Sequence, residues 1–78
     1  MVTLYSKNAC VQCKMTKKYL VEHHISFTEH NIDLEPQYRE RVIDLGYLAA
    51  PVIENGEESW SGFRPDELKK LIEAEITS

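Results

Sequence analysis

Two cysteines separated by two residues, Cys10 and Cys13, constrain this chain more than any other feature of its sequence. They lie between a short β-branched and aromatic run and a stretch with helical periodicity. If the pair opens a helix, Cys10 lies where unpaired backbone N–H groups and the positive pole of the helix dipole favour a thiolate. Cys13 is one turn further along the same face and more shielded, so it can resolve a mixed disulfide formed at Cys10. The spacing predicts a redox-active pair, with Cys10 as nucleophile and Cys13 as resolving thiol.

The length of 78 residues predicts a single domain, residues 1–78, with a small core. A bridge between positions 10 and 13 closes only a very short loop, worth about 2 kcal/mol in the chain-entropy model, so stability is a poor reason for it. The sequence shows no secretory leader, and its longest apolar run, residues 47–53, is far shorter than the roughly 20 residues that span a bilayer. We therefore expect a cytoplasmic protein without a membrane partner, in which a disulfide is transient and catalytic.

The charge pattern narrows the class of partner. The net charge is −4, and the basic residues form no block longer than the pairs Lys17-Lys18 and Lys69-Lys70. Nucleic acid binding has no electrostatic support in such a chain. We expect protein partners and a monomeric carrier.

Strand and helix signals alternate along the chain. We expect strands over 2–5, 25–32, 51–54 and 57–61, and helices over 11–23, 36–45 and from 64 or 65 onward. Asn55-Gly56 is a type I′ turn signal between the last two strands. The apolar stripe expected to be buried on the last helix is Leu68, Leu71, Ile72 and Ile76.

The order of these elements predicts the fold class. A strand, a helix and a second strand form a βαβ unit, whose two strands are parallel. Cys10 then lies at the carboxyl end of the first strand, where open α/β sheets place their functional sites. The full order, βαβ, helix, β-hairpin, helix, predicts an α/β fold with a four-stranded mixed sheet flanked by three helices.

A C-x-x-C pair near a βαβ pattern is typical of a thioredoxin-like redox motif. The chain resembles a glutaredoxin-sized member of the thioredoxin superfamily, and more closely the NrdH-redoxin family of small electron donors to class Ib ribonucleotide reductase. Two stretches carry this resemblance, which spans essentially the whole chain: Cys10-Val11-Gln12-Cys13 and Trp60-Ser61-Gly62-Phe63-Arg64-Pro65. The resemblance implies a thioredoxin-like fold, no bound cofactor, reduction by thioredoxin reductase at the expense of NADPH, and class Ib ribonucleotide reductase as the client.

The resemblance also implies roles for residues around the cysteines. Ala50-Pro51 corresponds to a cis-proline step that faces the pair and leaves the preceding backbone free to bind an extended substrate strand. The loop of residues 61–64 is expected beside the pair as a docking surface, with Phe63 as an apolar contact and Arg64 as a polar anchor. The expected partner-binding residues are Lys7, Val11, Gln12, Ala50, Pro51, Ser61, Gly62, Phe63 and Arg64.

Lys7 and Trp60 each have a second interpretation, and so does Phe63, which either contacts a partner or packs in the core. Lys7 either assists the thiol and guides an acidic partner, or it is an ordinary solvated lysine. In glutaredoxins a lysine near this position helps to hold glutathione. Trp60 either belongs to the docking surface or packs in the core.

Two other functions compete with the electron carrier. A glutathione-dependent glutaredoxin is the closer one, although Val11-Gln12 replaces the common Pro-Tyr, and Phe63-Arg64-Pro65 departs from the usual acidic glutathione-contacting stretch. The other is a non-catalytic zinc-binding or redox-sensing module, because Cys10, Cys13, His24 and His30 imitate a zinc-finger spacing. A helix over 11–23 would separate Cys13 from His24 by about 16 Å, so we expect no metal site.

Overall fold

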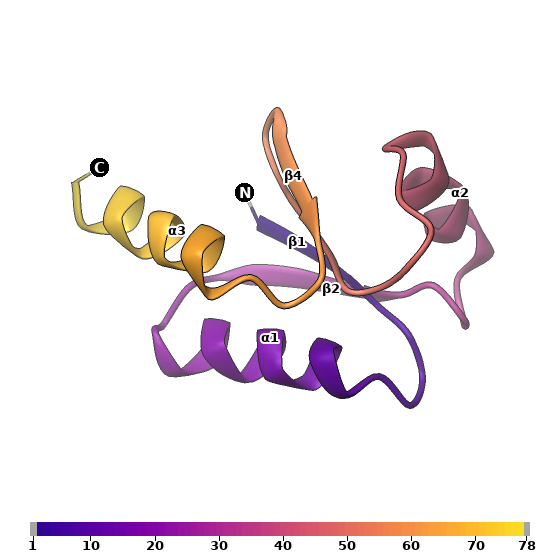
Figure 1. Ribbon diagram of the computed structural model, residues 1–78, viewed down its shortest axis with the longest axis horizontal. Coiled ribbons are helices and arrows are strands. Elements are labelled where there is room, and N and C mark those ends of the chain that lie inside the picture. Colours follow the sequence, from indigo (N-terminus) through magenta and orange to yellow (C-terminus); the bar gives the residue numbers. More distant parts are fainter. Residues whose placement is uncertain (1, 78) are drawn as a thin grey trace.

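A computed structural model describes the backbone of residues 2–77 and the side chains of residues 2–73. Three helices flank one sheet of four strands, in the strand order β2-β1-β3-β4 (Figure 1). The elements are β1 (Val2–Ser6), α1 (Val11–Glu22), β2 (Phe27–Asn31), α2 (Pro36–Asp44), β3 (Val52–Asn55), β4 (Glu58–Ser61) and α3 (Pro65–Thr77). β1 is parallel to β2 and antiparallel to β3, and β3 is antiparallel to β4. The predicted α/β class and mixed four-stranded sheet are confirmed.

Alternating residues of the strands divide the core between the two faces of the sheet. Leu4 and Ile53 point to the face where Leu20 of α1 and Leu68 of α3 pack, and all four side chains are fully buried. Tyr5 and Val52, their neighbours in sequence, pack with Val42 of α2 on the opposite face. Helices α1 and α3 therefore share one face, and α2 covers the other, apart from them (Figure 1). Ile76, expected in the buried stripe of α3, lies outside the described side chains.

The second strand is shorter than the predicted 25–32, because the apolar signal of Ile25 belongs to a helix cap. His24 has a left-handed backbone with φ +56°. The N–H of Ile25 donates to the Leu20 carbonyl at 3.0 Å, and the N–H of His24 donates to the Val21 carbonyl at 3.1 Å. This is the hydrogen-bond pattern of a Schellman motif, in which the residue after the left-handed position packs back on the helix. Ile25 is buried beside Leu20 in the core, and β2 begins only at Phe27.

The predicted hairpin is present, but its turn residues are one position later than expected. Asn55 pairs with Glu58, so the two turn residues are Gly56 and Glu57 rather than Asn55 and Gly56. Of these two, only Gly56 has a positive φ, +63°. A type I′ turn needs two positive φ values, whereas glycine at the first central position is typical of type II′. The buried side chains of Val52, Ile53 and Trp60 fix the strand register, and the turn follows from it.

None of the helices described between residues 2 and 77 combines the length and the apolar character needed to cross a bilayer.

A half-buried ion pair connects α2 to the sheet at Glu54. The Tyr5 hydroxyl donates to one carboxylate oxygen of Glu54 at 2.8 Å, and the Arg41 guanidinium binds the other. The hydrogen bond from Arg41, supported by the one from Tyr5, lowers the pKa of Glu54 below its ordinary value of 4.5 although burial opposes this. A carboxyl group with a depressed folded-state pKa contributes stability above its unfolded pKa and loses it as the pH falls through the folded one.

We predict that Glu54→Gln lowers the free energy of unfolding most at neutral pH and less below about pH 4, because protonation removes the ion pair from the native protein as well. Urea unfolding of both proteins between pH 3 and pH 7 measures this difference. Glu57→Gln is the matched control, since Glu57 is exposed in the same hairpin and has no ion-pair partner among the described residues. A Glu54→Gln effect that is constant over this pH range would contradict the assignment.

Candidate active site

Cys10 caps the first helix of the βαβ unit, as the sequence predicted. Its backbone is extended, with φ −115° and ψ 106°, and its carbonyl accepts the first helical hydrogen bond, from Lys14 N–H at 3.2 Å. Its Sγ accepts a hydrogen bond from the Cys13 N–H at 3.1 Å. The two cysteines form a disulfide, with their Cα atoms 5.2 Å apart. The Cys13 N–H, which has no acceptor within the helix, therefore points at the Cys10 sulfur, and this sulfur has to carry the negative charge in the reduced protein.

Both cysteines are largely covered by protein in this state. Cys10 is the more exposed of the two, as expected, but only by a small margin: 7% against 4%. Part of the cover is the loop before β3, whose Ala50 carbonyl oxygen lies 4.0 Å from the Sγ of Cys10. This loop therefore limits access to the Cys10 sulfur.

The loop before β3 contains the cis proline that the resemblance implied. The Ala50–Pro51 peptide bond is cis, and Pro51 is fully buried. The Pro51 carbonyl accepts a hydrogen bond from the Gly62 N–H at 2.8 Å. Next to it, the Ser61 hydroxyl donates to the Ala49 carbonyl at 3.0 Å. These bonds hold residues 49–51 and 61–62 together beside Cys10.

Gln12 joins the cysteine motif to the loop that leads into α3. Its Oε1 accepts a hydrogen bond from the Phe63 N–H at 3.2 Å, across 51 positions of sequence. Gly62, with φ +89°, makes the turn that brings this N–H into place. The predicted role of Gln12 was a partner contact, and no local sequence pattern marks it as the link between α1 and the loop before α3.

The remaining predicted docking residues lie in different environments. Val11, beside Cys10, is 71% exposed. Phe63 is half-buried, with its ring edge-on to that of Tyr19 at a centroid distance of 6.4 Å. The guanidinium of Arg64, directly before α3, forms an ion pair at 2.8 Å with Asp66 in the first turn of that helix. Trp60 is 5% exposed and packs in the core cluster of α1 and α3, which supports the core interpretation of this residue.

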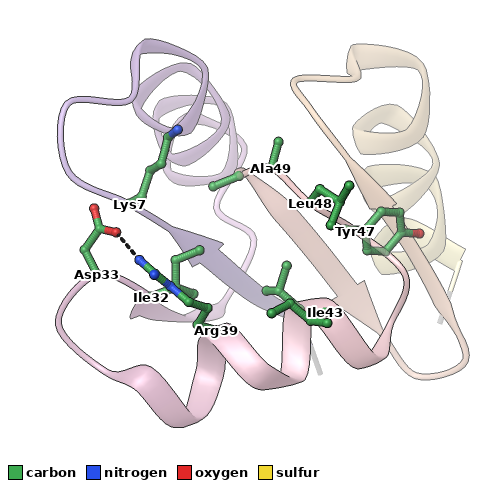
Figure 2. Close-up of a pocket in the computed structure, with 10 residues that line it drawn as sticks. Lys7, Ile32, Asp33, Arg39, Ile43, Tyr47, Leu48 and Ala49 are labelled. Atoms are coloured by element: carbon green, nitrogen blue, oxygen red, sulfur yellow. Dashed lines mark hydrogen bonds and ion pairs between the residues drawn. The ribbon is translucent and has the colours of Figure 1, made fainter.

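Two cavities share Lys7 as a lining residue. The first, of about 280 Å³, is lined by both cysteines together with Lys7 and Lys14. The second, of about 320 Å³, lies between α2 and the loop before β3 (Figure 2). Lys7 and the Asp33–Arg39 ion pair, 2.8 Å long, lie on one side of it (Figure 2). Its other lining residues include Ile43, Tyr47, Leu48 and Ala49. Among the described residues Lys7 has no ion-pair partner, so its charge is available to a bound molecule.

The zinc-finger spacing seen in the sequence does not produce a cluster. His24 follows the end of α1, and His30 lies on β2 with its ring stacked on that of Tyr38 at 3.7 Å. Within the described part of the chain, no group of three or more His, Cys, Asp or Glu residues is placed to hold a metal ion.

Comparison with known proteins places this site in a family. The family model for glutaredoxin matches residues 2–60. The glutaredoxin-like protein NrdH of Lactococcus lactis subsp. cremoris is 59% identical over 71 residues, which cover 91% of this chain and 99% of the relative. The chain belongs to the glutaredoxin family, as an NrdH-type member. The NrdH protein of Salmonella typhimurium is 39% identical over 70 residues, covering 90% of this chain and 86% of that protein.

Solved structures of NrdH and glutaredoxin proteins have the same fold. The NrdH-redoxin of Escherichia coli, described as having a thioredoxin-like activity profile, superposes with a TM-score of 0.85 at 38% identity, over 90% of this chain and 92% of that one. A glutaredoxin from Archaeoglobus fulgidus superposes with a TM-score of 0.75 at 30% identity, over 91% of this chain and 84% of that one. The NrdH-type chain is thus a thiol-disulfide oxidoreductase with a redox-active Cys10–Cys13 pair on a thioredoxin-like fold.

We predict that Gly62→Ala destabilises the protein by about 1–2 kcal/mol, because an L-residue is strained at this φ. Space is not the cause, since an added Cβ would lie at ordinary contact distance, 3.6 Å, from Gln12 Oε1. Gly46→Ala is the matched control: its φ is +96° and an added Cβ meets nothing within 4 Å. Urea unfolding is expected to give similar losses for both variants, whereas reduction of insulin disulfides is expected to slow only for Gly62→Ala. Equal rates for the two variants would show that the position of this loop does not matter to exchange.

Proposed function

We propose that this NrdH-type chain is the electron carrier of a class Ib ribonucleotide reductase and is itself reduced by thioredoxin reductase with electrons from NADPH. The observation that carries the proposal is the 59% identity to an NrdH protein over 91% of the chain. The net charge of −4 and the lack of a basic block in the sequence favour a protein client over a nucleic acid. The chemistry belongs in a reducing compartment such as the bacterial cytoplasm.

The exchange proceeds through two sulfur substitutions. The Cys10 thiolate attacks one sulfur of the client disulfide, forms a mixed disulfide, and releases the other client sulfur as a thiolate that takes up a proton. Cys13 then loses its proton and attacks the Cys10 sulfur, which expels the second client thiolate. Two electrons pass to the client, and the carrier is left with the Cys10–Cys13 disulfide seen in the structure.

The surroundings of Cys10 suit these steps. The Cys13 N–H, 3.1 Å from the Cys10 sulfur, stabilises its thiolate. The backbone of Ala50, next to the cis bond and beside Cys10, is the place for an extended client strand. We assign Val11 and Phe63 to apolar contacts with the client, and Lys7 to an acidic group on it.

Glutathione is the second candidate reductant, on the strength of one observation. Lys7, which has no ion-pair partner among the described residues, lines the cavity of Figure 2. Ala50, 4.0 Å from the Cys10 sulfur through its carbonyl oxygen, lines the same cavity, so a small anionic peptide bound there has a cation to bind. Against it, the sequence lacks the Pro-Tyr and the acidic stretch of glutathione-dependent relatives. The thioredoxin-like activity profile of the Escherichia coli relative also favours thioredoxin reductase.

We predict that Cys10→Ser abolishes turnover, and that Cys13→Ser forms a stable mixed disulfide through Cys10, because the resolving thiol is missing. Mass spectrometry of the trapped adduct with a disulfide-containing client peptide identifies the bonded cysteine. A Cys10→Ser variant that is trapped through Cys13 would reverse the two roles.

The reductant is identified by NADPH consumption during reduction of a model disulfide, with thioredoxin reductase in one reaction and glutathione plus glutathione reductase in the other. We expect turnover with thioredoxin reductase and little with glutathione. Reduction of a class Ib ribonucleotide reductase is then measured as deoxyribonucleotide formed per NADPH. Turnover with glutathione alone would make the chain a glutathione-dependent glutaredoxin, and turnover with neither would contradict both assignments.

A further inference from the structure

The turn that delivers Cys10 to α1 has an unusual backbone. Ala9, directly before Cys10, is left-handed, with φ +52°. L-residues other than Asn and Asp rarely adopt this conformation, since the Cβ atom crowds the following carbonyl. Ala9 is exposed, so packing of its own side chain does not hold it there. Contacts of its neighbours must therefore hold the turn in place.

These contacts come from the end of β2 and the loop that follows it. The N–H of Asn8 donates to Asp33 Oδ2 at 3.0 Å, and Asn31 Nδ2 donates to the Asn8 side-chain oxygen at 2.9 Å. The N–H of Asp33 donates in turn to Asn31 Oδ1 at 2.9 Å, which closes the network. The turn before Cys10 is thus fastened at Asn8 by both the backbone and the side chain.

Arg39 of α2 fixes the orientation of the Asp33 carboxylate. Its Nη2 donates to Asp33 Oδ1 at 2.8 Å, which leaves the other oxygen for the Asn8 N–H (Figure 2). The Asp33 side chain is 30% exposed, and that of Arg39 is 56% exposed. A carboxylate held between a guanidinium and a backbone N–H keeps one geometry despite this exposure.

We propose that Asp33, supported by Asn31, is a positioning residue for the redox reaction. It holds the left-handed turn at Ala9, and this turn keeps the Cys10 sulfur within hydrogen-bond distance of the Cys13 N–H. Asp33 acts through Asn8 and Ala9, and it reaches Cys10 only by way of the backbone. Without it, Ala9 is free to return to a negative φ, which rotates Cys10 out of its cap position. The Cys10 thiolate then loses its hydrogen-bond donor and reacts as a weaker nucleophile at neutral pH.

The test is the rate at which iodoacetamide alkylates Cys10 in the reduced full-length protein, measured from pH 5 to pH 9. We expect Asp33→Ala to slow alkylation at pH 7 by at least about threefold, the lower end of what one lost hydrogen bond costs, and to move the midpoint of the pH profile upward. Asp44→Ala removes an exposed acid from the end of α2 and is expected to match the parent protein. An Asp33→Ala profile that matches Asp44→Ala would overturn the proposal.

Two further variants separate positioning from simple loss of stability or charge. Ala9→Gly lowers the cost of the left-handed turn, so combining it with Asp33→Ala is expected to recover part of the alkylation rate. Asp33→Asn keeps an oxygen for the Asn8 N–H and is expected to stay near the parent rate. If the combined variant recovers nothing, or if Asp33→Asn is as slow as Asp33→Ala, the effect does not pass through the turn and the proposal is wrong.

The thiol-disulfide equilibrium between the protein and dithiothreitol tests the proposal independently. Loss of the hydrogen bond to the Cys10 thiolate removes stabilisation from the reduced form, so Asp33→Ala is expected to become the stronger reductant. A threefold change in this equilibrium corresponds to about 14 mV for a two-electron couple. A change toward a weaker reductant would contradict the assigned role.

Discussion

A single hydrogen bond, from the Cys13 N–H to the Cys10 sulfur, is the interaction that the rest of the structure serves. It exists because β1 ends where α1 begins, so the first unpaired N–H groups of the helix meet a sulfur at the carboxyl edge of the sheet. The two core clusters hold this edge rigid from both faces, with α1 and α3 on one side and α2 on the other. A small core is sufficient because the reaction needs only one correctly placed pair of sulfurs.

Three loops converge on that pair, and main-chain groups make most of the connections between them. The Gly62 N–H binds the Pro51 carbonyl, the Phe63 N–H binds Gln12, and the Asn8 N–H binds Asp33. Backbone donors do not titrate and have little rotational freedom, so these connections do not depend on the protonation state of their donors. Val11, beside Cys10, stays exposed, which suits the client contact proposed for it.

The charge of the protein is positive beside the cysteines and negative overall. The chain as a whole carries −4, yet Lys7 and Lys14 line the cavity that contains both cysteines. A local positive charge favours a thiolate and attracts an acidic segment of a client, while the net negative charge disfavours nucleic acids. This combination suits a thiol-disulfide oxidoreductase and is in keeping with the protein partners proposed for it.

The sequence by itself determined the order of strands and helices, the cysteine pair at the start of α1, and the family, because periodicity, caps and motifs are local properties of the chain. It misjudged Ile25 and the hairpin turn, since a buried apolar residue serves a helix cap as well as a strand, and burial of Val52 and Ile53 sets the register. Only the tertiary structure decided that Gln12 holds the loop at Phe63, that Trp60 packs in the core, and that Asp33 fastens the turn before Cys10. Those contacts join residues 25 to 51 positions apart in the two hydrogen-bonded cases, a separation that no sequence pattern encodes.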